Sequence, residues 1–386
     1  MSTNGCLLLA VQALVMVILT INAAATWPTP SCGQYDMTDF TFDSGEKLDV
    51  PLELHYQTLG QLRTAPDGSG RKNAVLILHG PTQSSAQFFS DLFAAQLSNT
   101  GQALDASKYF LVLPDGIGHG NSSKPSRASS HNSSSSRNNS SNKTGGATKM
   151  AFPKYQYSDM VRACHGLPTE HLNVPHVRLV LGISMGGMNA WMLGEEYSDF
   201  ADALMPVASL PVAVGDQNWL YRKMIMELVT ADPAWKGGEY EADQQPPMAL
   251  RAGYYLARLL FSSPVSMTQQ YPTQAAVDGF VDEVNHDLDR GIFDANDQIY
   301  AWNALGNITV PLTAVNTADD RANPPELGVP ILERTVTEKM RPGLGRAVTL
   351  LISNATFGHS SYISARLWVN ELRMLLSRTS STDISF

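Results

Sequence analysis

The chain has 386 residues, of which 43% are hydrophobic and 16% are charged, a composition typical of a globular protein with one large domain and room for an inserted subdomain. Its formal net charge of -9 provides no basic field that could neutralise phosphates, and no Lys/Arg cluster lies on a predicted helix face. This excludes nucleic acid and anionic membrane surfaces as expected partners.

Residues 1–25 have the pattern of a secretory signal peptide. A hydrophobic run from Cys6 to Ile21 is interrupted only by Gln12 and Thr20, and small residues that signal peptidase accepts follow it. No Lys or Arg precedes the run, so an uncleaved membrane anchor is the alternative. The expected localisation is secreted or within the secretory pathway, without stable membrane insertion after cleavage, or else anchored to the membrane by this signal.

Glycosylation sequons and cysteines also bear on the prediction that the protein enters the secretory pathway. Asn-x-Ser/Thr begins at Asn121, Asn132, Asn138, Asn139, Asn142, Asn307 and Asn354, which favours a glycoprotein, although one Ser/Asn-rich tract generates most of these by composition alone. Removal of Cys6 with the signal leaves Cys32 and Cys164. They either form one disulfide or remain two buried thiols, because spacing alone does not show whether their Cα atoms come close.

The predicted strands are of two kinds. Val50 to Gly60 alternates apolar and polar residues, which predicts an edge strand with one wet face. Later runs are short and almost continuously apolar, as parallel strands buried on both faces must be. These runs are Ala74 to His79, Tyr109 to Asp115, Arg178 to Ile183, Ala203 to Ala208, Val310 to Asn316 and Ala347 to Ser353.

Segments with helical periodicity separate these strands: Ala86 to Leu97, Ser158 to Leu172, Met185 to Tyr197, Glu326 to Met340 and Ser361 to Arg378. Repeated alternation of strand and helix predicts a mostly parallel sheet flanked by helices on both faces. Residues 215–305 contain several helical patterns and no convincing strand. We therefore predict an α/β core at 40–214 and 306–380, with a helical cap inserted at 215–305.

The tract from 121 to 149 is dominated by Ser, Asn, Gly and Lys/Arg and has almost no apolar residue with which to build a core. It is predicted to be a disordered, glycosylated surface loop. Connections inside compact domains usually have about 4 to 6 residues, so this tract looks like an insertion that the fold tolerates.

The sequence GISMGGMNAW, from Gly182 to Trp191, contains Gly-x-Ser-x-Gly directly after a predicted strand and directly before a predicted helix. This is the setting of a nucleophile elbow, a turn so sharp that Ser184 is held in strained backbone geometry. A Cβ at Gly182 or Gly186 would collide with the neighbouring strand and helix. The helix from Met185 also directs its N-terminal amides toward a developing oxyanion.

A serine hydroxyl needs a base to take its proton, and after such an elbow the order along the chain is Ser, then Asp or Glu, then His. His171 and His176 precede Ser184, and His286 lies in the predicted cap. His359 follows the last predicted strand in the sequence FGHSSY. It is therefore the predicted general base.

Two adjacent carboxylates, Asp319 and Asp320, follow the predicted strand VPLTAVN. Side chains of adjacent residues at a strand end point in different directions, so only one of them can reach His359. The other is expected to be a solvated loop carboxylate or a cap for the helix at Glu326. The residues alone do not decide between them.

An oxyanion hole needs two backbone N–H donors, one from Met185 and one from the loop HGPTQSS that begins at His79. Pro81 has no N–H to donate. Either Thr82 supplies the amide through a shifted loop, or one donor is missing, which typically costs about 10²- to 10³-fold in rate. His79 and the run DGIGHGNSS, residues 115–123, are interpreted as structural groups that frame the pocket.

Taken together, these motifs resemble the homoserine O-acetyltransferase-like branch of the α/β-hydrolase superfamily, from about Phe40 to Leu376. The most specific matches are GISMGGMNAW, RKMIMELVTADPAWKGGEY, NTADDRANPPELG and FGHSSY. In the family the acid is followed four residues later by Pro, which selects Asp320, with Pro324, over Asp319. The resemblance also places Arg222 where acetyltransferases carry an Arg that faces the active-site tunnel. This implies contact with an acidic substrate group or, alternatively, a salt bridge within the cap.

The chain departs from the family at Ser360, where acetyltransferases usually have an Asp thought to hold the homoserine amine. Without that carboxylate a cationic amine loses its partner, and a secreted protein would meet little acetyl-CoA. We therefore predict hydrolysis of a small-molecule acyl ester or thioester through an acyl-enzyme on Ser184, with no metal or organic cofactor. One alternative is O-acyl transfer of the homoserine O-acetyltransferase type, with acetyl-CoA as co-substrate. The second is a non-catalytic extracellular binding protein with this fold.

Overall fold

A computed structural model describes residues 27–66, 70–127, 148–211, 213–291, 293–304, 313–325 and 346–379. The predicted signal at 1–25, most of the tract at 121–149, the sequon at Asn307 and the predicted helix at 326–340 lie outside these residues. The sequons at Asn121 and Asn354 lie within them, and both asparagines are exposed. In the part of the chain that is described, no helix is long and apolar enough to cross a membrane.

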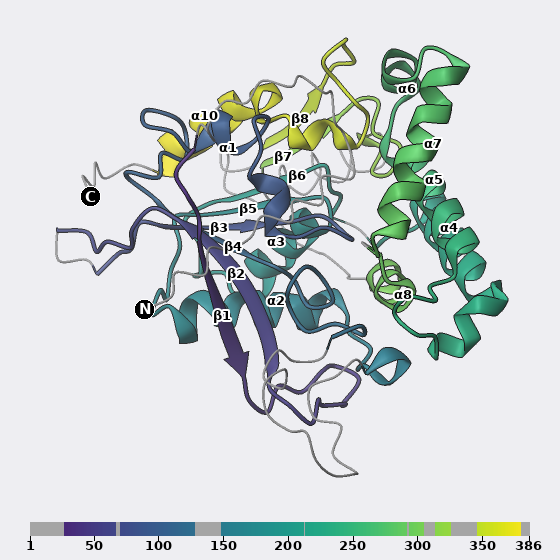
Figure 1. The fold of residues 1–386 in the computed structure, drawn as a ribbon. Coiled ribbons are helices and arrows are strands. Elements are labelled where there is room, and N and C mark those ends of the chain that lie inside the picture. The colour runs from purple at the N-terminus through teal and green to yellow at the C-terminus, as the bar shows by residue number, and fades with distance from the viewer. Residues whose placement is uncertain are drawn as a thin grey trace.

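The described strands form one sheet in the order β1-β2-β4-β3-β5-β6-β7-β8 (Figure 1). The pairings of β1 with β2 and of β2 with β4 are antiparallel, and all the others are parallel. The strands are β1 (Ser31–Met37), β2 (Leu52–Leu59), β3 (Ala74–Leu78), β4 (Phe110–Pro114), β5 (Leu179–Ile183), β6 (Leu204–Val207), β7 (Thr313–Thr317) and β8 (Arg346–Leu350). The predicted mostly parallel sheet is confirmed.

The two edges of the sheet differ from the prediction. β2 is not an edge strand, because β1 pairs with its outer side. β1 lies before the predicted core boundary at residue 40, and only Tyr35 and Met37 of its side chains are buried. At the opposite edge β8 is only partly buried, and Leu351 and Ile352, predicted to continue a fully buried strand, are exposed. An edge strand has a neighbour on one side only, so its sequence need not be apolar throughout.

Helices cover both faces of the sheet because successive residues of a buried strand point to opposite faces. Leu76 and Leu78 of β3 pack with α2 and α3, whereas Val75 and Ile77 pack with α1 and α10 (Figure 1). These helices are α1 (Ala94–Leu97), α2 (Tyr157–Gly166), α3 (Met185–Glu196) and α10 (Val369–Thr379). Short helical turns adjoin them at η1 (Ser85–Phe88), η2 (Lys149–Ala151), η3 (Leu167–His171), η5 (Ser360–Ile363) and η6 (Ala365–Leu367).

Between β6 and β7 the chain forms a helical insertion, which lies on the right in Figure 1. It consists of α4 (Asp216–Ala231), η4 (Pro233–Gly238), α5 (Pro247–Phe261), α6 (Pro264–Gln270), α7 (Gln274–Asp289) and α8 (Ala295–Asn303). One of its apolar clusters joins Ile225, Leu260 and Trp302 to Ala322, which belongs to the loop after β7. The insertion therefore packs against a loop at the carboxyl end of the sheet.

The cysteine pair considered from the sequence is not formed. Cys164, in α2, is a free thiol that is buried in the apolar core, and burial raises its pKa to about 12. Cys32 lies on β1 with its side chain exposed, so the alternative of two buried thiols is also wrong.

The Ser/Asn-rich tract leaves and rejoins the fold at one place. The Lys149 N–H donates to the Pro125 carbonyl at 2.8 Å, which joins the two flanks of residues 128–147. Asp297 of α8 accepts from the Ser126 N–H and hydroxyl at 2.9 and 2.7 Å and pairs with Lys124 at 3.1 Å. Residues 121–127 and 148–149 therefore have defined contacts with the fold, so the prediction of a disordered loop over 121–149 is wrong for these residues.

We expect that replacing residues 128–147 with a short Gly/Ser linker leaves the protein folded. Its free energy of unfolding should be unchanged or about 1 kcal/mol higher, because closing a shorter loop costs less entropy. By contrast, Asp297→Ala should lower it by about 1–3 kcal/mol, since Ser126 and Lys124 lose their acceptor. Urea unfolding of both variants measures this, and failure of the linker variant to fold would contradict the assignment of the anchors.

Candidate active site

Ser184, His359 and Asp320 form a hydrogen-bonded row. Ser184 Oγ lies 2.7 Å from His359 Nε2, and His359 Nδ1 lies 3.0 and 2.9 Å from Oδ1 and Oδ2 of Asp320. All three side chains are buried. The structure thus brings together the predicted nucleophile, base and acid in the geometry that activates a serine.

Ser184 sits on the turn between β5 and α3 with φ 54° and ψ −113°, a conformation that L residues rarely adopt. A Cβ at Gly182 would lie 2.0 Å from the Gly186 carbonyl oxygen, and a Cβ at Gly186 would lie 2.3 Å from the Leu78 carbonyl oxygen. Both obstacles are backbone atoms, which cannot turn away. The predicted strain at the serine and the predicted need for both glycines are confirmed.

The two adjacent carboxylates have separate tasks. Asp320 Oδ1 also accepts from the N–H groups of Ala322 and Asn323, at 2.9 and 2.8 Å, so the acid is held firmly. Asp319 Oδ2 accepts from the Gly358 N–H at 3.1 Å and the Thr356 hydroxyl at 3.2 Å. Asp319 is therefore not a solvated loop carboxylate, and the helix at Glu326 that it was alternatively expected to cap lies outside the described residues. Asp319 holds the loop that carries His359.

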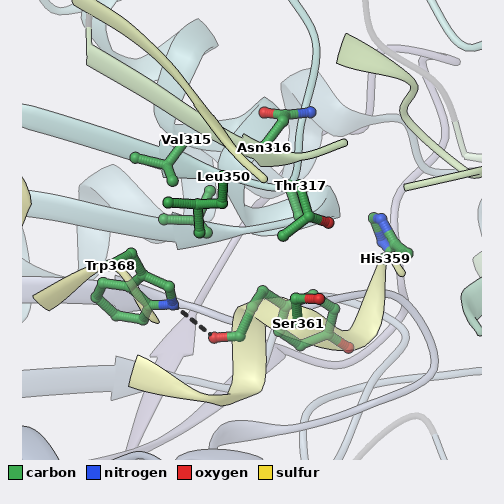
Figure 2. A pocket seen from close by; sticks show the side chains of 10 residues that line it. Val315, Asn316, Thr317, Leu350, His359, Ser361 and Trp368 are labelled. Atoms are coloured by element: carbon green, nitrogen blue, oxygen red, sulfur yellow. Dashed lines mark hydrogen bonds between the residues drawn. The ribbon is translucent and has the colours of Figure 1, made fainter. Parts of the chain in front are cut away.

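Further hydrogen bonds anchor the loop of His359, which Figure 2 shows near Thr317 at the end of β7. Thr317 and Ser361 donate their hydroxyls to the Gly358 carbonyl at 2.9 and 2.7 Å. Further along the loop, Trp368 Nε1 donates to the Tyr362 carbonyl at 3.0 Å. The base is thus fixed by the backbone on either side of it.

Comparison with known proteins places the chain in a family. Residues 73–342 match the family described as alpha/beta hydrolase fold.

The chain belongs to the α/β-hydrolase fold family.

Individual relatives are distant. A homoserine O-acetyltransferase from Geotalea daltonii is 26% identical over 364 residues, 84% of this chain and 91% of that protein. One from Natronomonas pharaonis is 25% identical over 268 residues, 66% of this chain and 61% of that protein, so the match spans less than two thirds of its length. The crystal structure of esterase E22 superposes with a TM-score of 0.73 at 16% identity, covering 90% of this chain and 100% of that one. This α/β-hydrolase is therefore an enzyme with esterase- and acetyltransferase-like relatives.

In this α/β-hydrolase the loop after β3 passes directly beside the nucleophile. A Cβ at Gly80 would lie 3.7 Å from Ser184 Cβ and 3.3 Å from Gln83 Oε1, which accepts from the Tyr362 hydroxyl at 3.4 Å. Thr82 has φ 59°, the left-handed region. Neither Met185 nor Thr82 donates its N–H to a backbone carbonyl of the described residues. Gln83 and Tyr362, which lie in the motifs HGPTQSS and FGHSSY but had no predicted role, border the site.

The groups interpreted as structural hold this loop in place. His79 Nε2 accepts from the Gly116 N–H at 2.8 Å, and its Nδ1 lies 2.7 Å from the Gly80 carbonyl. Asp115 accepts from the Ser85 N–H at 2.7 Å and pairs with His55 at 2.9 Å. Burial opposes ionisation of Asp115, but its hydrogen bond to His55 and the charge of that ring outweigh burial and lower its pKa to about 2.

Arg222 of α4 is buried and has no ion pair among the described residues. Its Nε donates to Asn218 Oδ1 at 2.9 Å, and Nη1 donates to the carbonyls of Trp302 and Ala304 at 3.3 and 3.2 Å. The salt bridge proposed as an alternative is thus not found in the described part of the chain. That part also holds no cluster of three or more His, Cys, Asp or Glu side chains suited to a metal ion.

The elbow makes a sharp prediction for glycine substitutions. Gly186→Ala should lower the free energy of unfolding by at least about 1–3 kcal/mol, the usual cost of overpacking, because its Cβ meets backbone. Gly279→Ala in α7 is the matched control, since nothing lies within 4 Å of its Cβ. It should instead raise the free energy of unfolding by about 0.5–1 kcal/mol, the cost of Gly within a helix. Thermal and urea unfolding compare the two, and equal effects would contradict the geometry.

The pH dependence of the free energy of unfolding should reflect the titration of His119. This residue lies beside His79, with ring centroids 5.2 Å apart. Burial and the neighbouring His79 lower the pKa of His119 from 6.5 to about 3. Between pH 6.5 and about 3 the unfolded chain binds a proton that the folded protein does not. The contribution of His119 to the free energy of unfolding is therefore fully present above pH 6.5 and decreases as the pH is lowered below that value. This one residue should remove about 1.4 kcal/mol per pH unit.

The measurement is urea unfolding of wild type and His119→Gln at pH 7, 6 and 5. The variant should lose less stability per pH unit than wild type. Parallel pH dependences would show that His119 does not carry the effect.

Proposed function

We propose that this α/β-hydrolase is a serine hydrolase that cleaves a small acyl ester or thioester through an acyl-enzyme on Ser184. The observation that carries the proposal is the contact of 2.7 Å between Ser184 Oγ and His359 Nε2, with Asp320 on the other ring nitrogen. A buried histidine in this position takes the hydroxyl proton as the oxygen attacks. The intact row does not support a binding protein without catalysis.

The reaction has two steps. Ser184 Oγ attacks the acyl carbonyl, His359 takes its proton, and Asp320 holds the Nδ1–H and stabilises the imidazolium. The N–H groups of Met185 and Thr82 serve the oxyanion, since α3 begins at Met185 and directs its free amides toward the site. His359 returns the proton to the leaving alcohol or thiol. Water then attacks the acyl-enzyme by the same route and releases the acid.

Transfer to an acceptor hydroxyl is the second candidate. It is favoured by the homoserine O-acetyltransferases among the relatives and by the buried Arg222, which has no carboxylate partner in the described part of the chain. A guanidinium without a carboxylate partner can bind an anionic group of a substrate. Against homoserine as acceptor, Ser360 donates its hydroxyl to the Phe261 carbonyl at 3.0 Å. The side chain where the resemblance implies an amine-binding carboxylate is thus neutral and already engaged.

We expect a fluorophosphonate probe to label the wild-type protein and neither Ser184→Ala nor His359→Ala. On short-chain nitrophenyl esters, Asp320→Asn should lower kcat by about 10⁴-fold, the effect of losing the correct imidazole tautomer. Asp319→Asn is the matched control, because Asp319 contacts the loop of His359 but not its ring. It should cost far less.

Labelling that persists in Ser184→Ala, or is absent from folded wild type, would overturn the proposal. Acetyl transfer from acetyl-CoA to homoserine that exceeds ester hydrolysis would favour the transferase instead. Equal losses in Asp319→Asn and Asp320→Asn would contradict the assignment of Asp320.

A further inference from the structure

An aromatic ring from the helical insertion covers one face of the His359 imidazole. Phe261, the last residue of α5, is stacked on His359 with ring centroids 5.1 Å apart and planes inclined by 26°. Tyr362 approaches edge-on, with centroids 5.4 Å apart. Both Phe261 and His359 are buried. The base therefore has Ser184 and Asp320 at its ring nitrogens and a phenyl face above its plane.

Contacts on both sides of His359 hold Phe261 in this position. Ser360 donates its hydroxyl to the Phe261 carbonyl at 3.0 Å. Gly358 has φ 67°, and a Cβ there would lie 2.7 Å from the Ser263 nitrogen. The chain that leaves Phe261 thus runs against the loop of His359, and that loop has a glycine where the two backbones are closest.

A second layer backs the ring. Trp302 of α8 is stacked behind Phe261, with centroids 5.9 Å apart and planes inclined by 27°. The Arg222 guanidinium lies over the Trp302 ring, 5.6 Å from its centroid. Phe261 therefore makes stacking contacts with both His359 and Trp302, which connect the base to the helical insertion.

During acyl transfer, His359 becomes positively charged when it takes the Ser184 proton. The electron-rich face of an aromatic ring attracts a cation within about 6 Å. Phe261 therefore interacts more strongly with the imidazolium than with the neutral ring, and only such a difference speeds a reaction. Among the described residues, the titratable groups that contact His359 or its loop are Asp320 at its Nδ1, Asp319 at the Gly358 N–H, and Tyr362, whose pKa burial raises to about 12. Of the two described aromatic rings in contact with His359, Phe261 is stacked on it, whereas the Tyr362 plane is inclined by 78°.

We propose that Phe261 is a positioning residue that stabilises the His359 imidazolium formed during acyl transfer, so that the helical insertion contributes directly to catalysis. The inference rests on the proposed function, because it assigns Phe261 a part in that chemistry.

The first test is Phe261→Leu, which removes the ring and keeps an apolar side chain. It should lower kcat/KM by about 2- to 30-fold, chiefly through kcat, and move the acid limb of the pH–rate profile to lower pH, because the charged base loses its partner. If Phe261 only excluded water, the limb would move to higher pH, since hydration favours the charged form. The direction of the shift thus separates the proposed role from simple shielding.

Two further variants control for damage to the insertion. Phe280→Leu makes the same change in α7, where the ring packs on Tyr271 with centroids 5.1 Å apart and does not contact His359. It should leave the profile unchanged. Phe261→pentafluorophenylalanine keeps the shape of the ring but reverses the charge of its face. It should therefore move the acid limb to lower pH, as Phe261→Leu does, and it serves as the test if Phe261→Leu folds poorly.

A readout independent of turnover is the titration of His359 by NMR, with its signal assigned from the spectrum of His359→Gln. A lower titration midpoint in Phe261→Leu and the fluorinated variant, but not in Phe280→Leu, would support the proposal. An unchanged or higher midpoint would overturn it. Failure of wild type to react with a fluorophosphonate would instead sink the hydrolase proposal, while the midpoints would still decide whether the ring stabilises the cation.

Discussion

The parallel order of β5, β6, β7 and β8 is the constraint on which the site depends. Parallel strands end at the same edge of a sheet, so the residues that follow them are delivered to one place. Ser184 follows β5 directly, Asp320 lies in the turn after β7, and His359 lies in the longer loop after β8. Hydrogen bonds of 2.7 to 3.0 Å then join three segments that are far apart in sequence.

Such a row of buried polar groups is stable only when the surrounding backbone satisfies it. Asp320 accepts two N–H groups of its own loop as well as the imidazole. Asp319, Thr317 and Ser361 hold the backbone at Gly358. Hence the acid and the base each sit on a loop that is rigid before substrate arrives, and preorganisation of this kind is what electrostatic catalysis requires.

Local sequence was sufficient for the elbow and the buried strands, because a strained turn demands glycine and a strand covered on both faces demands apolar side chains. It was insufficient for β1, of whose residues only Tyr35 and Met37 are buried, and for the choice between Asp319 and Asp320. Adjacent carboxylates differ only in direction, which depends on the turn they occupy, and the resemblance to a family was needed to choose. The sequence predicts one helix from Ser361 to Arg378, where the structure has the short turns η5 and η6 before α10. This difference and the stacking of Phe261 on His359 could not be predicted, since both depend on tertiary packing.

Ser360 and Phe261 are best understood as one linked feature. The resemblance implies a carboxylate at position 360, but an ionised carboxylate has no proton to donate. An Asp there would set its oxygens against the Phe261 carbonyl, which the Ser360 hydroxyl now satisfies at 3.0 Å. The Ser360 hydroxyl therefore connects the end of α5 to the residue next to the base, at the position where the resemblance implies an amine-binding carboxylate. A serine at position 360 thus accounts both for the absence of an amine-binding carboxylate there and for the stacking of Phe261 on His359. Both features favour a neutral acyl ester as substrate over an amino acid as acceptor.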